Sequence, residues 1–425
     1  MVAQLTRQRL LASPCEFSEV DAVLAQYSVT PLPGPAAVAD FALARIRELA
    51  LEETFFVVDL GMAARLHACF VGALPRVTPF YAVKCMPEPG LLRMLAALGA
   101  GFDCASAAEL TAVLGMGVPP SRIIYAHPVK PPAQVRWAAE SGVDLTTADT
   151  VGELEKLARW HPRTAVLLRI RADDPSASCC LGNKYGAEPI DAFGLLVAAR
   201  SLGLDIAGVC FHVGSGATNP QAFTAAIASA RKVFNMGAGL GFRMRLLDLG
   251  GGFVNRPGPD GLPCLGGVPA AINAALDAHF PDGAGVRVIA EPGRFFAEHT
   301  GTLLCAVHGK RERAAPNGGR HVDYWISDGI YGNLNGIYYD HLQPVAVPLR
   351  VHEPNASPEP TTASSSSLFG PTCDGADVVL SSCVLPELAV GDYVLFPGLG
   401  AYSWAGAADF NGFTCRDVRF MHVYS

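Results

Sequence analysis

The sequence lacks several features that would assign it to a class directly. Its twelve cysteines form no CxxC pair, it has no long basic run, and no stretch of membrane-spanning length is free of charges. We therefore expect no metal site, and a chain of 425 residues needs no disulfide framework. A net charge of −7 without a basic run argues against a nucleic-acid partner. The lack of a charge-free stretch long enough to cross a bilayer argues against a membrane protein.

The N-terminal stretch MVAQLTRQRLLASPCEF also lacks the apolar core of a secretory signal peptide. The scattered cysteines are typical of reduced thiols in a chain of this size. We therefore expect a cytoplasmic protein. A weakly amphipathic transit segment at the N-terminus stays open as an alternative.

Strand patterns alternate with helical patterns over most of the chain. Strands are predicted at 79–84, 101–105, 122–127, 143–148, 165–172, 205–213, 243–250 and 285–291. Leucines recur on one face after the first of them, and Asp149 or Thr150 is expected to cap the helix after the fourth. Strands alternating with helices imply parallel pairing, whose closed form is an α/β fold, the (β/α)8 barrel of the TIM type. An open doubly wound sheet is the alternative, but MPEPG after the first strand is not a dinucleotide fingerprint.

Beyond Arg294 the helical periodicity fades and short apolar runs alternate with polar turns. This texture predicts a second, all-β domain of antiparallel strands. We expect a barrel at 58–295, a β domain at 296–425, and an N-terminal segment at 1–57 that adds a strand, within EETFFVVDL, to the β domain. The low-complexity stretch 353–367 is predicted to be a mobile surface loop.

Lys84 ends the first predicted strand, within PFYAVKCMPEPG. Lysine is almost never fully buried unless something holds it, and a desolvated lysine becomes an amine nucleophile. The alternative is a strand-end lysine whose ammonium group reaches solvent along its apolar stem.

The other predicted strand ends are also polar, and barrel enzymes place their sites at the carboxyl ends of the strands. They carry Asp103, Arg169, His212 to Gly216, Asp248 to Gly252, and Glu291 to Arg294. Each of these residues alone is weak evidence for a site, because a histidine in a strand is usually a core residue and a glycine run is usually a turn. Chance is a poor explanation for so many polar residues at the same end of the predicted barrel.

Together these residues predict a phosphate-bearing ring cofactor. Glycines at 250–252 let backbone N–H groups approach a phosphate, and the nearby serine and arginine add donors. Glu291 can keep a ring nitrogen protonated, and His212 is flat enough to stack on the ring. Lys84 can form an imine with an aldehyde. This combination describes pyridoxal phosphate, an electron sink for a carbanion.

The motifs PFYAVKC, GFDCAS, FHVGSG, LDLGGGF, AEPGR, GPTCDG, and GAY followed by FNGF resemble those of eukaryotic, plant-type ornithine decarboxylases. These are barrel-type enzymes with the alanine-racemase-like fold. The match runs in family order from about Phe55 to the C-terminus, across both predicted domains. It implies pyridoxal-phosphate-dependent decarboxylation of L-ornithine to putrescine and CO₂, a step of polyamine biosynthesis. The alternatives are another basic amino acid, such as lysine or arginine, or a catalytically inactive regulatory paralogue.

The resemblance implies a set of site residues. Lys84 would bind the cofactor covalently, and Cys373 would return a proton to the α-carbon after CO₂ leaves. The other expected cofactor contacts are Asp103, Glu109, Arg169, His212, Ser215, Gly252, Glu291, Gly293, Arg294 and Tyr402. The expected substrate contacts are Tyr339, Asp340, Asp374 and Phe410, with both aspartates on the distal ammonium group. A cation that enters a partly desolvated pocket needs such carboxylates.

Members of this family are homodimers with shared active sites. The C-terminal domain would therefore carry dimer and active-site residues, and Cys373 and Asp374 would serve the lysine of the partner subunit. Lys184 and Asp377 match a pair that bridges the two subunits. Met86 and His127 depart from the family pattern without removing a catalytic group.

Overall fold

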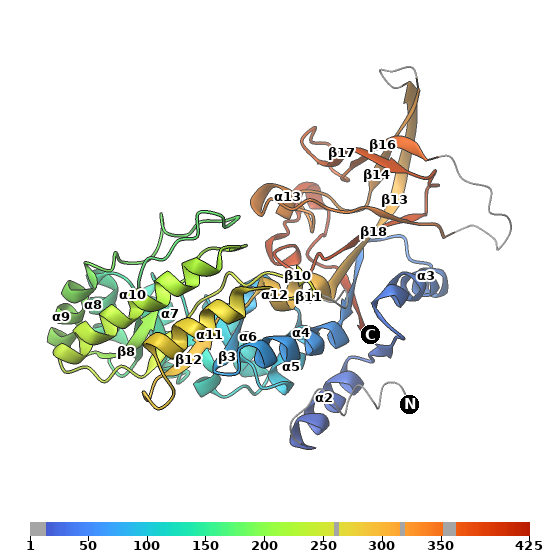
Figure 1. The fold of residues 1–425 in the computed structure, drawn as a ribbon. Helices are drawn as coiled ribbons and strands as arrows, with labels where there is room; N and C mark the ends of the chain where they lie inside the picture. Colours follow the sequence, from blue (N-terminus) through green and yellow to red (C-terminus); the bar gives the residue numbers. More distant parts are fainter. Residues whose placement is uncertain (1–13, 259–262, 315–318, 352–362) are drawn as a thin grey trace. The chain divides into compact units, whose positions relative to one another are not determined.

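The structure, a computed structural model, describes residues 14–258, 263–314, 319–351 and 363–425. The chain divides into two compact units (Figure 1). Unit 1 comprises the described residues up to Val23 together with Ala64–Phe296, and unit 2 comprises Leu24–Ala63 and Ala297–Ser425. The larger part of unit 1, Ala64–Phe296, is thus inserted into the sequence of unit 2.

Unit 1 contains a closed barrel with the strand order β12-β3-β4-β5-β6-β7-β8-β9. Its strands are β3 (Val77–Ala82), β4 (Gly101–Cys104), β5 (Ile123–Tyr125), β6 (Leu145–Ala148), β7 (Ala165–Arg169), β8 (Asp205–Cys210), β9 (Leu246–Asp248) and β12 (Arg287–Ala290). Every neighbouring pair in the barrel is parallel. The predicted (β/α)8 barrel is confirmed, and each strand lies within or overlaps its predicted range.

Helices surround these strands in unit 1 (Figure 1). They are α4 (Leu60–Ala73), α5 (Pro89–Ala97), α6 (Ala107–Gly115), α7 (Pro132–Glu140), α8 (Val151–Trp160), α9 (Ala192–Ser201), α10 (Pro220–Gly239) and α11 (Val268–His279). Their starts follow from side-chain caps: Glu88 caps α5 and Ser106 caps α6. Of the two expected caps of α8, Thr150 is the one whose side chain accepts the Glu153 N–H.

A buried apolar cluster brings together side chains of non-adjacent barrel strands. It contains Phe80, Ile124, Leu167, Ala207, Cys210, Leu246 and Ile289. Strands β8 and β9 approach so closely at Gly208 that a Cβ there would lie 1.7 Å from the Leu246 carbonyl oxygen. The barrel therefore has a packed interior.

Unit 2 is built on a mixed nine-stranded sheet with the order β1-β19-β2-β13-β14-β16-β17, in which β18 pairs with β13 and β15. Its strands are β1 (Thr30–Pro31), β2 (Phe55–Asp59), β13 (Gly301–Ala314), β14 (Arg320–Ile326), β15 (Val347–Leu349), β16 (Ser364–Phe369), β17 (Val378–Leu385), β18 (Tyr393–Pro397) and β19 (Arg419–Tyr424). Helix α3 (Val38–Leu49) packs on this sheet through Ala42 and Ile46.

The prediction of purely antiparallel strands in unit 2 is wrong at three pairs. β19 pairs in parallel with β1 and β2, and β14 pairs in parallel with β16. Strands β2 and β19 lie far apart in the chain, and residues 60–418 between them, which include the whole barrel, form the long connection that a parallel pair needs.

The prediction of a mobile loop at 353–367 is also wrong at its end, because Ser364–Phe369 forms β16. The buried Ser367 hydroxyl donates to the Ser381 carbonyl at 2.8 Å and lies 3.0 Å from His321 Nε2. These bonds let a serine run occupy a sheet interior. The predicted loop up to residue 362 lies outside the described residues, as do residues 1–13, where a transit segment was the alternative.

The remaining short elements of the described chain are α2 (Pro14–Gln26), β10 (Arg256–Pro257), β11 (Pro263–Cys264), α12 (Arg294–Ala297) and α13 (Gly336–Tyr339). Among the described residues, no helix combines the length and the apolar character that a membrane crossing demands.

Candidate active site

Lys84 lies in a 3₁₀ turn, Val83–Cys85, immediately after β3. Its Nζ donates to Oδ2 of Asp103, a fully buried carboxylate on β4. The Lys84 side chain is 40 % exposed, so the amine is held by a carboxylate and is also accessible. Oδ1 of Asp103 is buried and has no hydrogen-bond partner among the described residues, which leaves an acceptor beside the amine.

Two further carboxyl groups lie at the same end of the barrel. Asp248 is the last residue of β9, and Glu291 follows β12. Burial raises the pKa of Asp248 to about 7. Burial, reinforced by repulsion from Asp248, raises the pKa of Glu291 well above its ordinary value. Glu291 therefore gives up its proton less readily than an exposed glutamate, which suits it to share a proton with a basic ring nitrogen.

His212 follows β8, and its ring orientation is fixed by the backbone. Its Nδ1 accepts the Gly214 N–H at 3.0 Å, which leaves the imidazole proton on Nε2. Burial, followed by the charges of Arg169 and Lys84, lowers the pKa of His212 well below its ordinary value. The ring is therefore neutral, and Gly251 leaves room for it, since a Cβ there would lie 2.7 Å from Nε2.

Glycines after β8 and β9 form a recess that we call the glycine cradle (residues 214–216 and 250–252). Gly252 has φ +104°, and a Cβ there would lie 2.7 Å from the Gly214 carbonyl oxygen, so only glycine fits. Arg294 Nη2 donates to the Ser215 hydroxyl at 3.3 Å. The recess thus combines a hydroxyl, a guanidinium group and backbone exposed by missing side chains, which suits a phosphate.

Three predicted cofactor residues occupy supporting positions. Glu109 lies in the first turn of α6, where its carboxylate accepts the Ala105 N–H at 2.6 Å, and burial raises its pKa. Arg169, the last residue of β7, has its guanidinium carbon 5.1 Å from the ring centroid of Tyr185. Gly293 lets the turn after β12 pack on the Lys84 turn, since a Cβ there would lie 3.0 Å from Cys85 Cβ.

A second group of predicted residues belongs to unit 2. Cys373 is exposed and precedes Asp374, whose Oδ1 accepts the Ala376 N–H at 3.0 Å and whose Oδ2 accepts the Tyr331 hydroxyl. The Tyr331 and Phe410 rings stack with centroids 4.3 Å apart. The hydrogen bond to Asp374 raises the pKa of Tyr331 to about 12, so its hydroxyl stays protonated as a donor.

Tyr331 was missed by the sequence reasoning. The only signal was an aromatic residue in the turn sequence DGIYGN, a composition typical of any surface turn. Its importance comes from its contacts with Asp374 and Phe410, which are distant in sequence.

The other predicted residues of unit 2 lie in turns. Tyr339 ends α13 and is 79 % exposed, and Asp340 follows it. Tyr402 has φ +53°, a backbone conformation that is unusual for a bulky residue and that accumulates at functional sites. Since Cys373, Asp374 and Phe410 share one cluster, the unit carries a coherent set of a thiol, a carboxylate and an aromatic ring.

Asp377 is buried in the loop that carries this cluster. Its Oδ1 accepts the Ile330 N–H at 3.0 Å, and its Oδ2 accepts the Thr372 N–H at 3.0 Å and the Thr372 hydroxyl at 2.7 Å. The carboxylate therefore fixes the residues that directly precede Tyr331 and Cys373. Its predicted pairing with Lys184 across subunits stays a prediction.

The two departures from the family pattern have local packing roles. Met86 is 1 % exposed, and its carbonyl accepts the Tyr81 hydroxyl at 3.1 Å. His127 Nδ1 accepts the Val129 N–H at 3.0 Å, and its ring meets the Tyr185 ring edge-on. Neither side chain replaces one of the polar groups described above.

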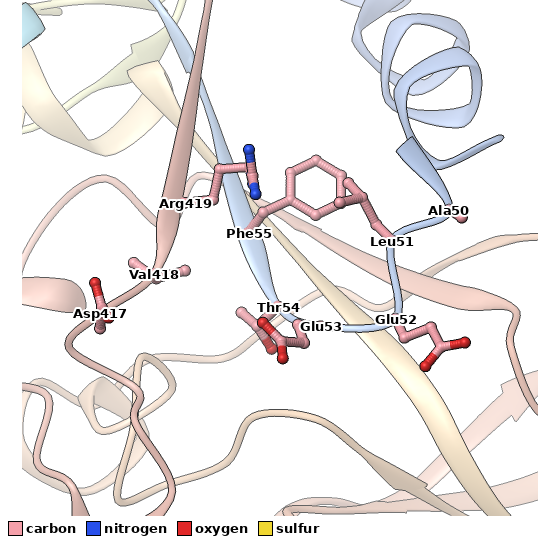
Figure 2. Close-up of a pocket in the computed structure, with 9 residues that line it drawn as sticks. All are labelled: Ala50, Leu51, Glu52, Glu53, Thr54, Phe55, Asp417, Val418 and Arg419. Carbon is pink, nitrogen blue, oxygen red and sulfur yellow. The ribbon is translucent and has the colours of Figure 1, made fainter. Parts of the chain in front are cut away.

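A cavity of about 640 Å³ in unit 2 is lined by residues 50–55 and 417–419. Figure 2 shows that its walls come from the segment that joins α3 to β2 and from the start of β19. None of the predicted site residues lines it. This cavity is therefore not part of the candidate active site.

The residues at the barrel mouth fit pyridoxal phosphate on structural grounds. Four features each match one part of that molecule. They are the Asp103 oxygen with no partner among the described residues, the cradle that any Cβ would fill, the flat neutral His212 ring, and the buried Glu291 carboxyl with its raised pKa. Lys84 supplies an accessible amine.

Residues 60–298 match the family described as "Pyridoxal-dependent decarboxylase, pyridoxal binding domain". The chain belongs to the pyridoxal-dependent decarboxylases, and its cofactor is pyridoxal phosphate. Within that family it is similar to ornithine decarboxylase of Rattus norvegicus, with 44 % identity over 87 % of this chain and 81 % of that protein.

Two further relatives show the range of the family. Antizyme inhibitor 2 of Xenopus laevis is 43 % identical over 87 % of this chain and 81 % of that protein. The crystal structure of the arginine decarboxylase of Paramecium bursaria Chlorella virus, bound to agmatine, superimposes with a TM-score of 0.83. It is 36 % identical, and the match covers 91 % of this chain and 99 % of that one.

Proposed function

We propose that the protein decarboxylates L-ornithine to putrescine and CO₂. The observation that carries the proposal is the Lys84 amine, held by the buried Asp103 carboxylate at the mouth of a barrel with a glycine cradle. The similarity to ornithine decarboxylases over most of the chain supports the choice of substrate.

In the proposed site, unit 1 supplies every residue assigned to the cofactor except Tyr402, which belongs to unit 2. Pyridoxal phosphate, when bound, supplies an electron sink for the electron pair left at the α-carbon. Lys84 provides the amine that anchors it, and Ser215, Gly252, Arg294 and Tyr402 are assigned to its phosphate. Glu291 holds a proton at the ring nitrogen, where its raised pKa suits it to share that proton. Asp103, Arg169 and Glu109 orient the polar groups around the amine.

Unit 2 is assigned to the substrate. Asp340 and Asp374 bind the distal ammonium group, and Tyr339 and Phe410 line its aliphatic chain. The Cys373 thiol, exposed in the chain, donates a proton to the α-carbon once CO₂ has left. Asp374 is already oriented by the Tyr331 hydroxyl and the Ala376 N–H, which favours a fixed site for the cation.

We also propose a homodimer whose sites combine unit 1 of one subunit with Cys373 and Asp374 of the other. Support comes from the exposure of Tyr339 (79 %) and Phe410 (42 %), apolar rings that a partner subunit would cover. Mixing Lys84→Ala chains with Cys373→Ala chains tests this arrangement. A mixture that regains activity above either parent supports it, and one that never does refutes site sharing.

Substrate choice is tested by CO₂ release from ornithine, lysine and arginine under identical conditions, with Lys84→Ala as the inactive control. We expect ornithine to give the highest kcat/KM, because the similarity over most of the chain is to ornithine decarboxylases, while Asp340 and Asp374 favour any substrate with a distal cation over a neutral one. A clear preference for arginine or lysine refutes the ornithine assignment while leaving decarboxylase chemistry intact.

An inactive regulatory relative is the competing function, since an antizyme inhibitor is among the similar proteins. The complete set of Lys84, Asp103, Glu291 and Cys373 argues against it. Purified protein should show a visible absorbance band that borohydride abolishes, with the cofactor's mass fixed on Lys84. A colourless protein with an unmodified Lys84 in excess cofactor would refute the enzymatic proposal. A cytoplasmic location remains part of the proposal, to be tested by fractionation.

A further inference from the structure

The segment Asp174–Cys180, which we call the strap, lies against the glycine cradle. Its backbone pairs with the cradle in both directions. Ser215 N donates to the Cys179 carbonyl at 3.0 Å, and Cys179 N donates to the Ser215 carbonyl at 3.1 Å. Ser215 is therefore held in place by the strap as well as by its own loop.

The strap also packs directly on the glycines of the cradle. A Cβ on Gly214 would lie 2.7 Å from Ala177 Cβ, and a Cβ on Gly216 would lie 2.5 Å from the Ser178 hydroxyl oxygen. Both glycines have positive φ, +110° and +74°. The strap thus forms one wall of the cradle, and the width of the cradle depends on where the strap is held.

Asp174 holds the strap. It is fully buried, and its carboxylate accepts four hydrogen bonds from two directions. Oδ1 accepts the N–H and the hydroxyl of Ser176 at 2.8 and 2.6 Å, which fixes the strap itself. Oδ2 accepts the N–H groups of Thr218 and Asn219 at 2.9 and 2.8 Å, which fixes the chain that follows the cradle.

The charge of Asp174 has a second consequence. Burial opposes ionisation, but the hydrogen bonds from Ser176, Asn219 and Thr218 outweigh it and leave the pKa of Asp174 below its ordinary value. Asn219 caps α10, so the carboxylate is bonded to the two residues that directly precede that helix.

We propose that Asp174 is the positioning residue of the phosphate site: by joining the strap to the start of α10, it sets the cradle that receives the cofactor's phosphate. The proposal rests on the proposed function, which assigns Ser215, Gly252 and Arg294 to that phosphate. Asp174 itself contacts none of the reacting atoms.

The test compares pyridoxal phosphate with pyridoxal, which lacks the phosphate, as ligands of the full chain freed of cofactor. In Asp174→Asn, the amide NH₂ cannot accept one of the two pairs of hydrogen bonds. We expect the Kd for pyridoxal phosphate to rise at least about tenfold, equivalent to ~1.4 kcal/mol, while the Kd for pyridoxal changes less than about twofold. Asp173→Asn is the matched control, because Asp173 pairs with Arg171 and the Gly182 N–H, away from the cradle. Its two Kd values should equal those of the wild type.

Equal loss of affinity for both ligands in Asp174→Asn would indicate a general structural role and overturn the proposal, as would no loss at all. If Asp174→Asn does not fold, Ser176→Ala carries the test, because it removes one hydroxyl donor to Asp174. An unchanged preference for pyridoxal phosphate in that variant also overturns the proposal. Failure of the proposed function looks different: the wild type itself would then bind the two ligands equally.

Discussion

Replacing Gly251 with alanine is a direct steric test of the site. The new Cβ would lie 2.7 Å from His212 Nε2 on one side and 3.0 Å from the Glu291 carbonyl oxygen on the other. Carbon contacts ordinarily lie at about 3.5 Å or more, so the ring must move by roughly 0.8 Å. It cannot do so freely, because its Nδ1 is bonded to the Gly214 N–H.

The cost can be worked out from these contacts. Overpacking a filled site costs about 1–3 kcal/mol, and losing the Gly214 bond adds about 1 kcal/mol. For a unit of this size each kcal/mol lowers Tm by roughly 2–4 °C, so a total cost of about 2–4 kcal/mol should lower Tm by about 4–16 °C. Displacing the His212 ring should also weaken cofactor binding roughly tenfold.

Thermal unfolding of the cofactor-free protein and a cofactor titration measure the two effects separately. Gly152→Ala is the matched control, because nothing lies within 4 Å of its Cβ position and alanine favours the α8 helix. It should melt at or slightly above the wild-type Tm. If Gly251→Ala melts and binds cofactor like the wild type, the placement of His212 beside Gly251 is wrong.

Three further predictions concern other parts of the chain. Tyr331→Phe removes the hydroxyl that donates to Asp374, so we expect KM for ornithine, measured by steady-state kinetics, to rise a few-fold while Tm stays unchanged. An unaltered KM would contradict this prediction. Lys130→Met removes one of the two lysines that pair with the buried Glu153 and leaves Lys156. Urea unfolding should show a free energy of unfolding that is about 3–5 kcal/mol lower, and a second substitution, Glu153→Gln, should restore part of it. Burial lowers the pKa of His67 to about 4, so between pH 6.5 and 4 the unfolded state binds more protons than the folded state. The free energy of unfolding should therefore fall as the pH drops from 6.5 to 4. Melting curves recorded across this pH range should show a smaller fall for His67→Gln.

The barrel could be read from the sequence because its signals are local. Each strand is a short apolar run followed by a helix with its own cap, and the polar strand ends follow from chain order alone. Chain order alone therefore predicts that four residues lie at the same end of the barrel: Lys84, Asp103, His212 and Glu291. What the pattern could not give is their pairing, such as the Lys84–Asp103 contact.

Non-local contacts explain what was missed. The serines of β16 carry no strand signal, and they enter the sheet only because His321 and the Ser381 carbonyl take their hydroxyl groups. Tyr331 and Asp174 matter through partners that lie more than forty residues away. The parallel pairing of β2 with β19 joins strands that lie far apart in the chain. No window of sequence holds such information.

The insertion of the barrel between β2 and β13 has a consequence for synthesis on the ribosome. Phe56 pairs with Leu303, so the apolar start of β2 leaves the exit tunnel 247 residues before its neighbour exists. At roughly 5–20 residues per second, that edge stays unpaired for on the order of 10–50 seconds, while the barrel can already close. Nascent chains of this protein should therefore need a chaperone that shields Phe55–Asp59 during that interval.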